Sequence, residues 1–392
     1  METTEWVAGL RCQDCRTLFD AATAGRCPDC GGTLDVDLQD PSVDRDAFAA
    51  PVGAGLSRYA PVLPFSVERL VSTGAGGTPV VDCPDIGDAL GVGSLAVKDE
   101  GRNPTGALAD RGAALAVTAA REQGATDVAL PSMGNTAQAV AAVAARAGLA
   151  SHAFVPSRVP FVNKAMINVH GGDMTVVGGR YADAAAAFRD AVEAEGWHRL
   201  DAFSTPFRHE GLTTAAYELC EQFGWAVPDA VVVPTGHGTA IAGLHLGFRR
   251  FAEWGLIDER PRLYAVQAEG CAPIVTARDR GASSVSPVET PDTVCGPLEI
   301  PEPAGGRRVL DAVDSSDGGA VAVDDEAMLE AAVDLAEAGL TAGVSAGAAL
   351  AGARTLATTG DLAAADDVVL VNPTSGTKEA DLLRSRLMSQ GQ

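Results

Sequence analysis

The chain has 392 residues, of which 46% are hydrophobic and 21% charged, so it can form two or three domains with a sizeable core. Its 29 basic and 52 acidic residues give a net charge of −23, which repels phosphate backbones and anionic lipid surfaces. We therefore expect no nucleic-acid partner and no membrane partner. The first residues, METTE, lack the basic and apolar regions of a secretory signal peptide, so a cytoplasmic location is expected.

Lysine is scarce in this chain, which has only Lys98, Lys164 and Lys378 against 26 arginines. Many carboxylates with few lysines are typical of halophilic proteins, in which molar salt screens the repulsion between like charges. GC-rich codon usage is the alternative explanation for the arginines and alanines, but it does not produce a surplus of carboxylates. The composition therefore favours a halophilic protein.

Four of the eight cysteines form a C-x2-C-x11-C-x2-C pattern: Cys12, Cys15, Cys27 and Cys30. Each C-x2-C pair can present two thiolates from one tight turn, and two such pairs make the tetrahedral four-sulfur site of structural zinc. The alternatives are free thiols or two disulfides, and disulfides are disfavoured in a cytoplasmic protein. We predict a zinc ribbon over residues 1–40, with a structural Zn2+ that has no open coordination position.

After a predicted linker at residues 40–56, apolar strand-like runs alternate with alanine-rich helical segments. The predicted strands are 94–97, 127–130, 153–155, 174–177, 230–233, 263–266 and 368–371. The predicted helices are 113–121, 137–147, 182–195, 213–223, 240–253, 326–338 and 346–357. This alternation predicts the α/β class, with mainly parallel sheets covered on both faces. Residues 281–288 and 301–306, rich in Pro and Gly, are predicted to be loop insertions.

Three glycine-containing loops follow predicted strands, at residues 131–136 (PSMGNT), 234–239 (PTGHGT) and 372–377 (NPTSGT). The backbone N–H groups of such loops, where a strand leads into a helix, can bind an anion. Taken alone, each loop favours the simpler interpretation of a tight turn, in which glycine relieves backbone strain.

Together with residues 97–112 (VKDEGRNPTGALADRG), 206–211 (PFRHEG), 267–270 (QAEG) and the cysteine ribbon, these loops resemble the threonine synthase family. The family consists of fold type II enzymes that use pyridoxal 5′-phosphate (PLP) and convert O-phosphohomoserine and water to threonine and phosphate. The resemblance implies two three-layer α/β subdomains with PLP in the cleft between them. It implies a larger subdomain from residues 41–109 and 206–385 and a smaller one from 110–205.

The resemblance also implies which residues hold the ligands. Asn135 would contact the 3′-oxygen of PLP, and either Thr374 or Ser375 would contact its pyridine nitrogen. The residues implied for the PLP phosphate are Gly236, His237, Gly238 and Thr239. Those implied for the substrate carboxylate are Ser132, Gly134 and Thr136. The family usually has a small residue at the position of His237, so an exposed loop histidine is an equally open interpretation.

One departure from the family matters most. The family reads GSFKDR where this chain reads GALADR over residues 106–111, so Ala109 stands at the position of the Schiff-base lysine. That lysine bonds the cofactor and moves protons at the substrate's carbons, which a methyl group cannot do. Because residues 107 and 108 differ too, natural divergence is favoured over an engineered lysine-to-alanine change. Lys98 is the first substitute to test, before Lys164 and Lys378, although ion-pair or surface roles are simpler for all three.

Two functions are consistent with these features. The first is a threonine synthase-like lyase with impaired or altered chemistry. The second is a pseudoenzyme that binds PLP or an amino acid non-covalently, or regulates a true synthase. Each function predicts a small amino-acid ligand. The sequence is consistent with a homo-oligomer or with a hetero-oligomer. A redox or metal enzyme built on the ribbon is excluded, because four thiolates fill the coordination shell of zinc.

Overall fold

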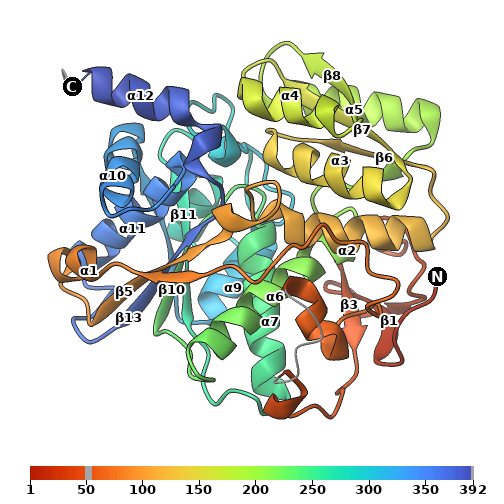
Figure 1. The fold of residues 1–392 in the computed structure, drawn as a ribbon, viewed down its shortest axis with the longest axis horizontal. Helices are drawn as coiled ribbons and strands as arrows, with labels where there is room; N and C mark the ends of the chain where they lie inside the picture. Colours follow the sequence, from red (N-terminus) through yellow and green to blue (C-terminus); the bar gives the residue numbers. More distant parts are fainter. Residues whose placement is uncertain (49–54, 390–392) are drawn as a thin grey trace.

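The computed structural model describes residues 1–48 and 55–389, which form three β-sheets with their surrounding helices (Figure 1). A small antiparallel sheet, in the order β2-β1-β3, opens the chain with β1 (Val7–Cys12), β2 (Leu18–Phe19) and β3 (Leu34–Leu38). A six-stranded and a four-stranded sheet follow. Among the described residues, no helix combines the length and apolar character needed to span a membrane.

The six-stranded sheet has the order β12-β11-β10-β13-β5-β4, and it is parallel except for β4 at the edge. Its strands are β4 (Val80–Asp82), β5 (Ser94–Asp99), β10 (Ala230–Pro234), β11 (Arg262–Ala268), β12 (Gly319–Val323) and β13 (Asp367–Asn372). Side chains alternate between its two faces, as the strand period of two requires. Val231 and Val233 pack with α6 (Pro206–Gln222), α7 (Thr239–Glu253) and α9 (Gly306–Ser315). Val232 packs on the opposite face with α10 (Asp325–Glu337) and α11 (Val344–Thr359).

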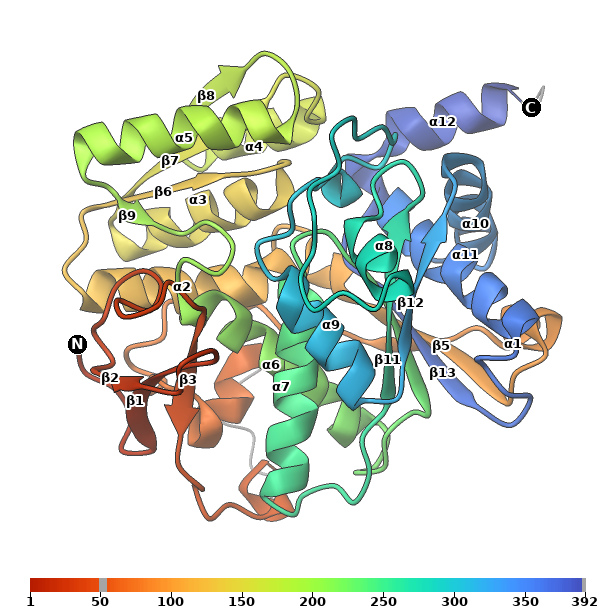
Figure 2. The same ribbon diagram turned by 180° about the vertical axis from the view of Figure 1, so that it is seen from behind.

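The four-stranded sheet is parallel throughout, in the order β8-β7-β6-β9. Its strands are β6 (Asp127–Pro131), β7 (Ala150–Pro156), β8 (Asp173–Val177) and β9 (His198–Arg199). One face carries α2 (Ala109–Glu122), α3 (Asn135–Ala147) and α4 (Phe161–Val169), and the other carries α5 (Tyr181–Glu195). Figures 1 and 2 show this smaller unit beside the larger one, with the N-terminal sheet packed near α6 and α7.

The structure confirms the predicted α/β class, and each predicted strand and helix is present, in most cases with longer ends. The sequence analysis missed β4, β9 and β12 and the short helices α1 (Pro84–Leu90), α8 (Pro273–Asp279) and α12 (Ala380–Ser389). It also missed α9, which begins at Gly306, where the predicted insertion at 301–306 ends. The predicted linker at 40–56 falls partly on residues 49–54, which lie outside the described residues. The subdomain boundaries stay predictions.

Four charged side chains are buried together where β5, α2 and α6 meet. Arg111 pairs with Glu100 and Glu218 at 2.7 Å each, and the Nζ atom of Lys98 is 2.7 Å from Glu218. Burial opposes ionisation of Glu218, but the charges of Arg111 and then Lys98 outweigh it and lower its pKa to about 2. Two positive and two negative groups balance one another. The cluster thereby fixes the first turn of α2 to the large sheet.

Removing one charge from this cluster should strongly destabilise the fold. Glu218→Gln leaves two buried cations with one carboxylate, so we expect a loss of about 3–5 kcal/mol in the free energy of unfolding, measured in urea. The control is Asp334→Asn, which breaks a partly exposed pair with Arg354 and should cost less than about 1 kcal/mol. Equal losses in the two variants would contradict the assignment of a structural charge cluster.

Candidate active site

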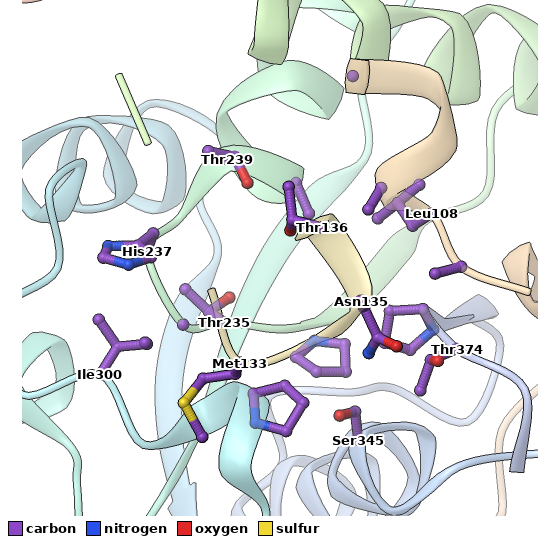
Figure 3. Close-up of a pocket in the computed structure, with 18 of the residues that line it drawn as sticks. Leu108, Met133, Asn135, Thr136, Thr235, His237, Thr239, Ile300, Ser345 and Thr374 are labelled. Atoms are coloured by element: carbon purple, nitrogen blue, oxygen red, sulfur yellow. The ribbon is translucent and has the colours of Figure 1, made fainter. Parts of the chain in front are cut away.

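A cavity of about 170 Å3 lies between the two larger sheets (Figure 3). Three loops from the carboxyl ends of β6, β10 and β13 contribute to its wall, together with the start of α2. The structure therefore brings together the three glycine-containing loops that the sequence singled out. A crevice at the carboxyl ends of parallel strands is where α/β folds bind their ligands.

The loop after β10 forms one side of the cavity and runs into the N-terminus of α7. Its glycines are needed for close packing: a Cβ atom on Gly236 would lie 2.5 Å from the carbonyl oxygen of Pro297. Gly238 has a φ of +89°, and a Cβ there would lie 2.3 Å from Val309. Thr239, the first residue of α7, also lines the cavity. A tight loop at the start of a 15-residue helix presents backbone N–H groups suited to a phosphate.

His237 in this loop supplies a further donor. Its Nδ1 atom accepts a hydrogen bond from the backbone N–H of Ala304 at 3.3 Å, so in the neutral ring the proton sits on Nε2. Burial, and then the charge of Arg208, lower the pKa of His237 to about 3, which keeps the ring neutral. The Nε2 atom is buried with no hydrogen-bond partner among the described residues. His237 therefore lies half-buried in the cavity wall with one donor unsatisfied, and its contact with a phosphate stays a prediction.

Arg208 brings a positive charge to the same cavity. It donates to the carbonyl oxygen of Leu200 and to Oγ1 of Thr136, each at 3.2 Å. No carboxylate in the described part of the chain lies within ion-pair distance of its guanidinium group. A half-buried guanidinium with only neutral acceptors provides a favourable site for an anion. Sequence reasoning assigned no role to Arg208, although it lies in the quoted segment 206–211.

The orientation of Asn135 is set from behind the cavity wall. Its Oδ1 atom accepts hydrogen bonds from Nζ of Lys378 at 3.1 Å and from Nδ2 of Asn163 at 3.0 Å. Because a lysine ammonium group can only donate, the atom that faces Lys378 must be the amide oxygen. The Nδ2 group of Asn135 is thereby left to donate to a ligand. Sequence reasoning weighed Lys378 only as a substitute amine and missed this contact.

The remaining predicted ligand residues separate into those in the wall and those outside it. Ser132, Thr136 and Thr374 line the cavity, whereas Gly134 and Ser375 do not.

Thr374 donates to the carbonyl oxygen of Gly106 at 3.2 Å, and its oxygen can still accept a hydrogen bond. Figure 3 shows Thr374 and Asn135 at one side of the cavity and His237 at the other. Ser345, at the start of α11, also lines it and was not predicted.

The four ribbon cysteines form a second candidate site, away from this cavity. Their sulfur atoms all lie within 4.8 Å of one another, with Cys12 and Cys30 at 3.5 Å and Cys15 and Cys27 at 3.6 Å. These separations are much longer than the roughly 2.05 Å of a disulfide bond. Four converging thiols form a donor set suited to a tetrahedral metal ion.

Comparisons with known proteins identify the family. A family model described as "Pyridoxal-phosphate dependent enzyme" matches residues 71–374. Threonine synthase from Methanocaldococcus jannaschii is 33% identical over 379 residues, which cover 95% of this chain and 93% of the relative. The chain belongs to the threonine synthase family of pyridoxal-phosphate dependent enzymes.

A second relative supports this assignment, and a solved structure supports the fold. Threonine synthase from Methanosarcina acetivorans is 34% identical over 367 residues, which cover 92% of this chain and 90% of the relative. The structure of maize serine racemase aligns with a TM-score of 0.68 at 21% identity, over 89% of this chain and 98% of that chain. The latter similarity supports the fold, which is that of fold type II PLP enzymes.

The cavity fits PLP in its binding groups, but its wall contains no lysine. Ala109, the first residue of α2, lines the cavity, and its side chain is only a methyl group. Lys98 is fully buried in the charge cluster, where Nζ donates to Glu218, Gln222 and the carbonyl oxygen of Thr78. Lys164 donates to the carbonyl oxygen of Ser157, beside α4. Neither lysine is part of the cavity wall, so a substitute role for either has no geometric support.

Lys378 should make the free energy of unfolding depend on pH in the alkaline range. Burial lowers its pKa from 10.5 to about 8, although Asp110 and Glu379 oppose the shift. Between these two pH values the unfolded chain binds more protons than the folded one, so this group makes stability rise with pH. Relative to Lys378→Met, the wild type should gain about 2–3 kcal/mol in unfolding free energy between pH 8 and 10.5.

Urea unfolding at several pH values measures this difference. Lys164→Met is the matched control for the loss of one lysine. Parallel pH profiles for the wild type and Lys378→Met would show that Lys378 keeps its ordinary pKa.

Proposed function

We propose that the protein is a threonine synthase-like protein that holds PLP without a covalent bond and has strongly impaired lyase activity. The proposal rests on one observation: the wall of the cavity keeps groups suited to the cofactor but has the methyl group of Ala109 where the family has its lysine. The chain therefore keeps groups suited to binding the cofactor but lacks the amine that would transfer protons. The natural ligand is an amino acid or its phosphate ester.

The residues around the cavity would hold PLP at three points. The backbone of Gly236 to Thr239 and Nε2 of His237 would bind the phosphate. Nδ2 of Asn135 would donate to the 3′-oxygen, and the hydroxyl of Thr374 would lie at the ring nitrogen. Bound PLP supplies an electron sink that stabilises negative charge at the substrate's carbons.

The substrate would be held through its negative charges. Arg208 and Thr136 form a polar pair at the wall, suited to the phosphate of O-phosphohomoserine or to a carboxylate. Ser132 lies in the same loop as Thr136, and its Oγ atom accepts hydrogen bonds from the N–H groups of Gly134 and Ala137. Its hydroxyl hydrogen is therefore free to donate to a carboxylate.

Proton transfer is the step that this site supports least. A positioned general acid or base contributes about 10²–10⁴-fold to the rate, and Ala109 offers neither. Chemistry at the substrate's carbons would then depend on water or on the substrate's own groups. This supports the second candidate function, in which the protein binds its ligands without turnover and regulates a true synthase in a hetero-oligomer.

Restoring the lysine tests the proposal. Ala109→Lys should gain the visible absorption of a lysine-bonded cofactor and release phosphate from O-phosphohomoserine about 10²–10⁴-fold faster than the wild type. Ala109→Met, a side chain of similar length without an amine, is the control and should gain neither. A wild type that turns over as fast as Ala109→Lys would contradict impaired chemistry. If neither binds PLP, then the cofactor assignment is wrong.

We also propose that the ribbon holds one structural Zn2+ through Cys12, Cys15, Cys27 and Cys30. The converging sulfur atoms support an ion that accepts four thiolates, and a closed site of this kind contributes to folding rather than to chemistry. Elemental analysis should find one zinc per chain, and Cys15→Ser should lower that content and the melting temperature. Cys83→Ser, which changes a cysteine outside the ribbon, is the control for zinc content. Absence of zinc in protein purified without chelator would contradict this proposal.

A further inference from the structure

A second cavity, of about 290 Å3, lies at the seam between the ribbon and the large unit. The ribbon forms one wall, α7 forms another, and the third is the start of α9 with the two residues before it. Figure 2 shows the ribbon (β1 to β3) beside the part of the large unit that contains α7 and α9. The cavity shares no lining residue with the candidate active site.

Arginines dominate the charged groups of this cavity. Four line it, Arg26, Arg249, Arg307 and Arg308, against two aspartates, Asp14 and Asp311. In a chain with a net charge of −23, such a local surplus of positive charge is unusual. Guanidinium groups present forks of N–H donors that match phosphate and carboxylate oxygens.

Two of these arginines are held in place by carboxylates. Arg307 pairs with Asp14 of the ribbon at 2.7 Å. Arg308 makes two hydrogen bonds to buried Asp35, one of them at 2.9 Å, and Asp35 also contacts His209 of α6 at 2.7 Å. These contacts fix part of the wall before any ligand binds.

The other two arginines are less constrained: Arg26 has no ion pair among the described residues, and Arg249 has one, with the exposed Glu253. Arg26 donates only to the carbonyl oxygens of Gly31 and Ala304, at 3.5 and 3.3 Å, and no described carboxylate lies within 4 Å of it. Arg249 has Glu253 3.5 Å from Nε, but this nitrogen is buried without a hydrogen bond. Burial and then the charges of Arg249, Arg260 and Arg308 lower the pKa of His245 in the same wall to about 4. The positive neighbours thus add to the effect of burial in opposing a further proton.

The wall of this cavity is connected to the candidate active site. The carbonyl oxygen of Ala304 accepts from Arg26, while its N–H donates to Nδ1 of His237. The N–H of Gly305 donates to the carbonyl oxygen of His237 at 3.1 Å. Ala304 and Gly305 therefore line the arginine cavity and also hold His237 in the loop after β10.

From these contacts we infer that the seam is a regulatory site for a compact anion with two or more oxyanion groups, such as a phosphate ester or a polycarboxylate. The anion bridges Arg26 of the ribbon and Arg249 of α7. It fixes the segment at Ala304 and Gly305, and with it His237. Only this coupling to PLP rests on the proposed function, because anion binding at the seam does not require it.

Inorganic pyrophosphate is a suitable probe, measured by titration calorimetry at constant ionic strength. With PLP occupying the active site, the wild type should bind one pyrophosphate per chain. Arg26→Gln with Arg249→Gln should weaken this binding at least tenfold. Arg278→Gln, which removes an arginine paired with Asp314 elsewhere on the surface, is the matched control and should stay within twofold of the wild type. Arg249→Gln alone keeps the test independent of any effect of Arg26 on the neighbouring ribbon cysteines.

Linkage supplies the second measurement. Pyrophosphate should change the PLP dissociation constant at least threefold in the wild type. It should leave that constant unchanged in Arg26→Gln with Arg249→Gln, which lacks the anion site. Coupling between two sites is reciprocal, so PLP should change the pyrophosphate dissociation constant by the same factor. If PLP itself does not bind, the proposed function fails, and the anion titration is run in Arg208→Gln, where the active-site cavity has lost its arginine. Absence of pyrophosphate binding there or with PLP, or equal binding by Arg26→Gln with Arg249→Gln, would overturn the inference.

Discussion

The buried charge cluster around Arg111 is the constraint on which the site depends. Arg111 lies two residues after Ala109, and its ion pairs with Glu100 and Glu218 join α2 of the smaller unit to β5 and α6. A buried charge without its partners is very costly, so this first turn of α2 has little freedom to move. The position of residue 109 in the cavity wall is therefore maintained although its side chain carries no amine.

A separate set of contacts holds the proposed cofactor-binding groups in place without the lysine. The groups suited to the cofactor belong to loops at the ends of β6, β10 and β13, and each is fixed by contacts outside the cavity. Lys378 and Asn163 orient Asn135, and Ala304 orients His237. None of these contacts involves residue 109. These contacts therefore do not depend on a lysine at residue 109.

The sequence predicted what local patterns determine. The apolar run at 230–233 and the alanine-rich helical segments were identified by their composition and their alternation along the chain, and the cysteine spacing located the thiol cluster. The sequence could not predict contacts between distant segments, such as Lys378 with Asn135 or Arg26 with Ala304, because they arise only when the chain folds. β12 was missed because its residues, GAVAV, are small and weakly distinctive. Arg208 was quoted as part of a motif, but its lack of a carboxylate partner is visible only in three dimensions.

We propose that this family member binds PLP without bonding it to a lysine. The most direct measurement is the intact mass of the wild-type protein after incubation with PLP and reduction with borohydride, followed by removal of free cofactor. We predict an unchanged mass, together with saturable PLP binding in an unreduced sample. A mass increase by one reduced cofactor, located by peptide mapping to Lys98, Lys164 or Lys378, would contradict the account.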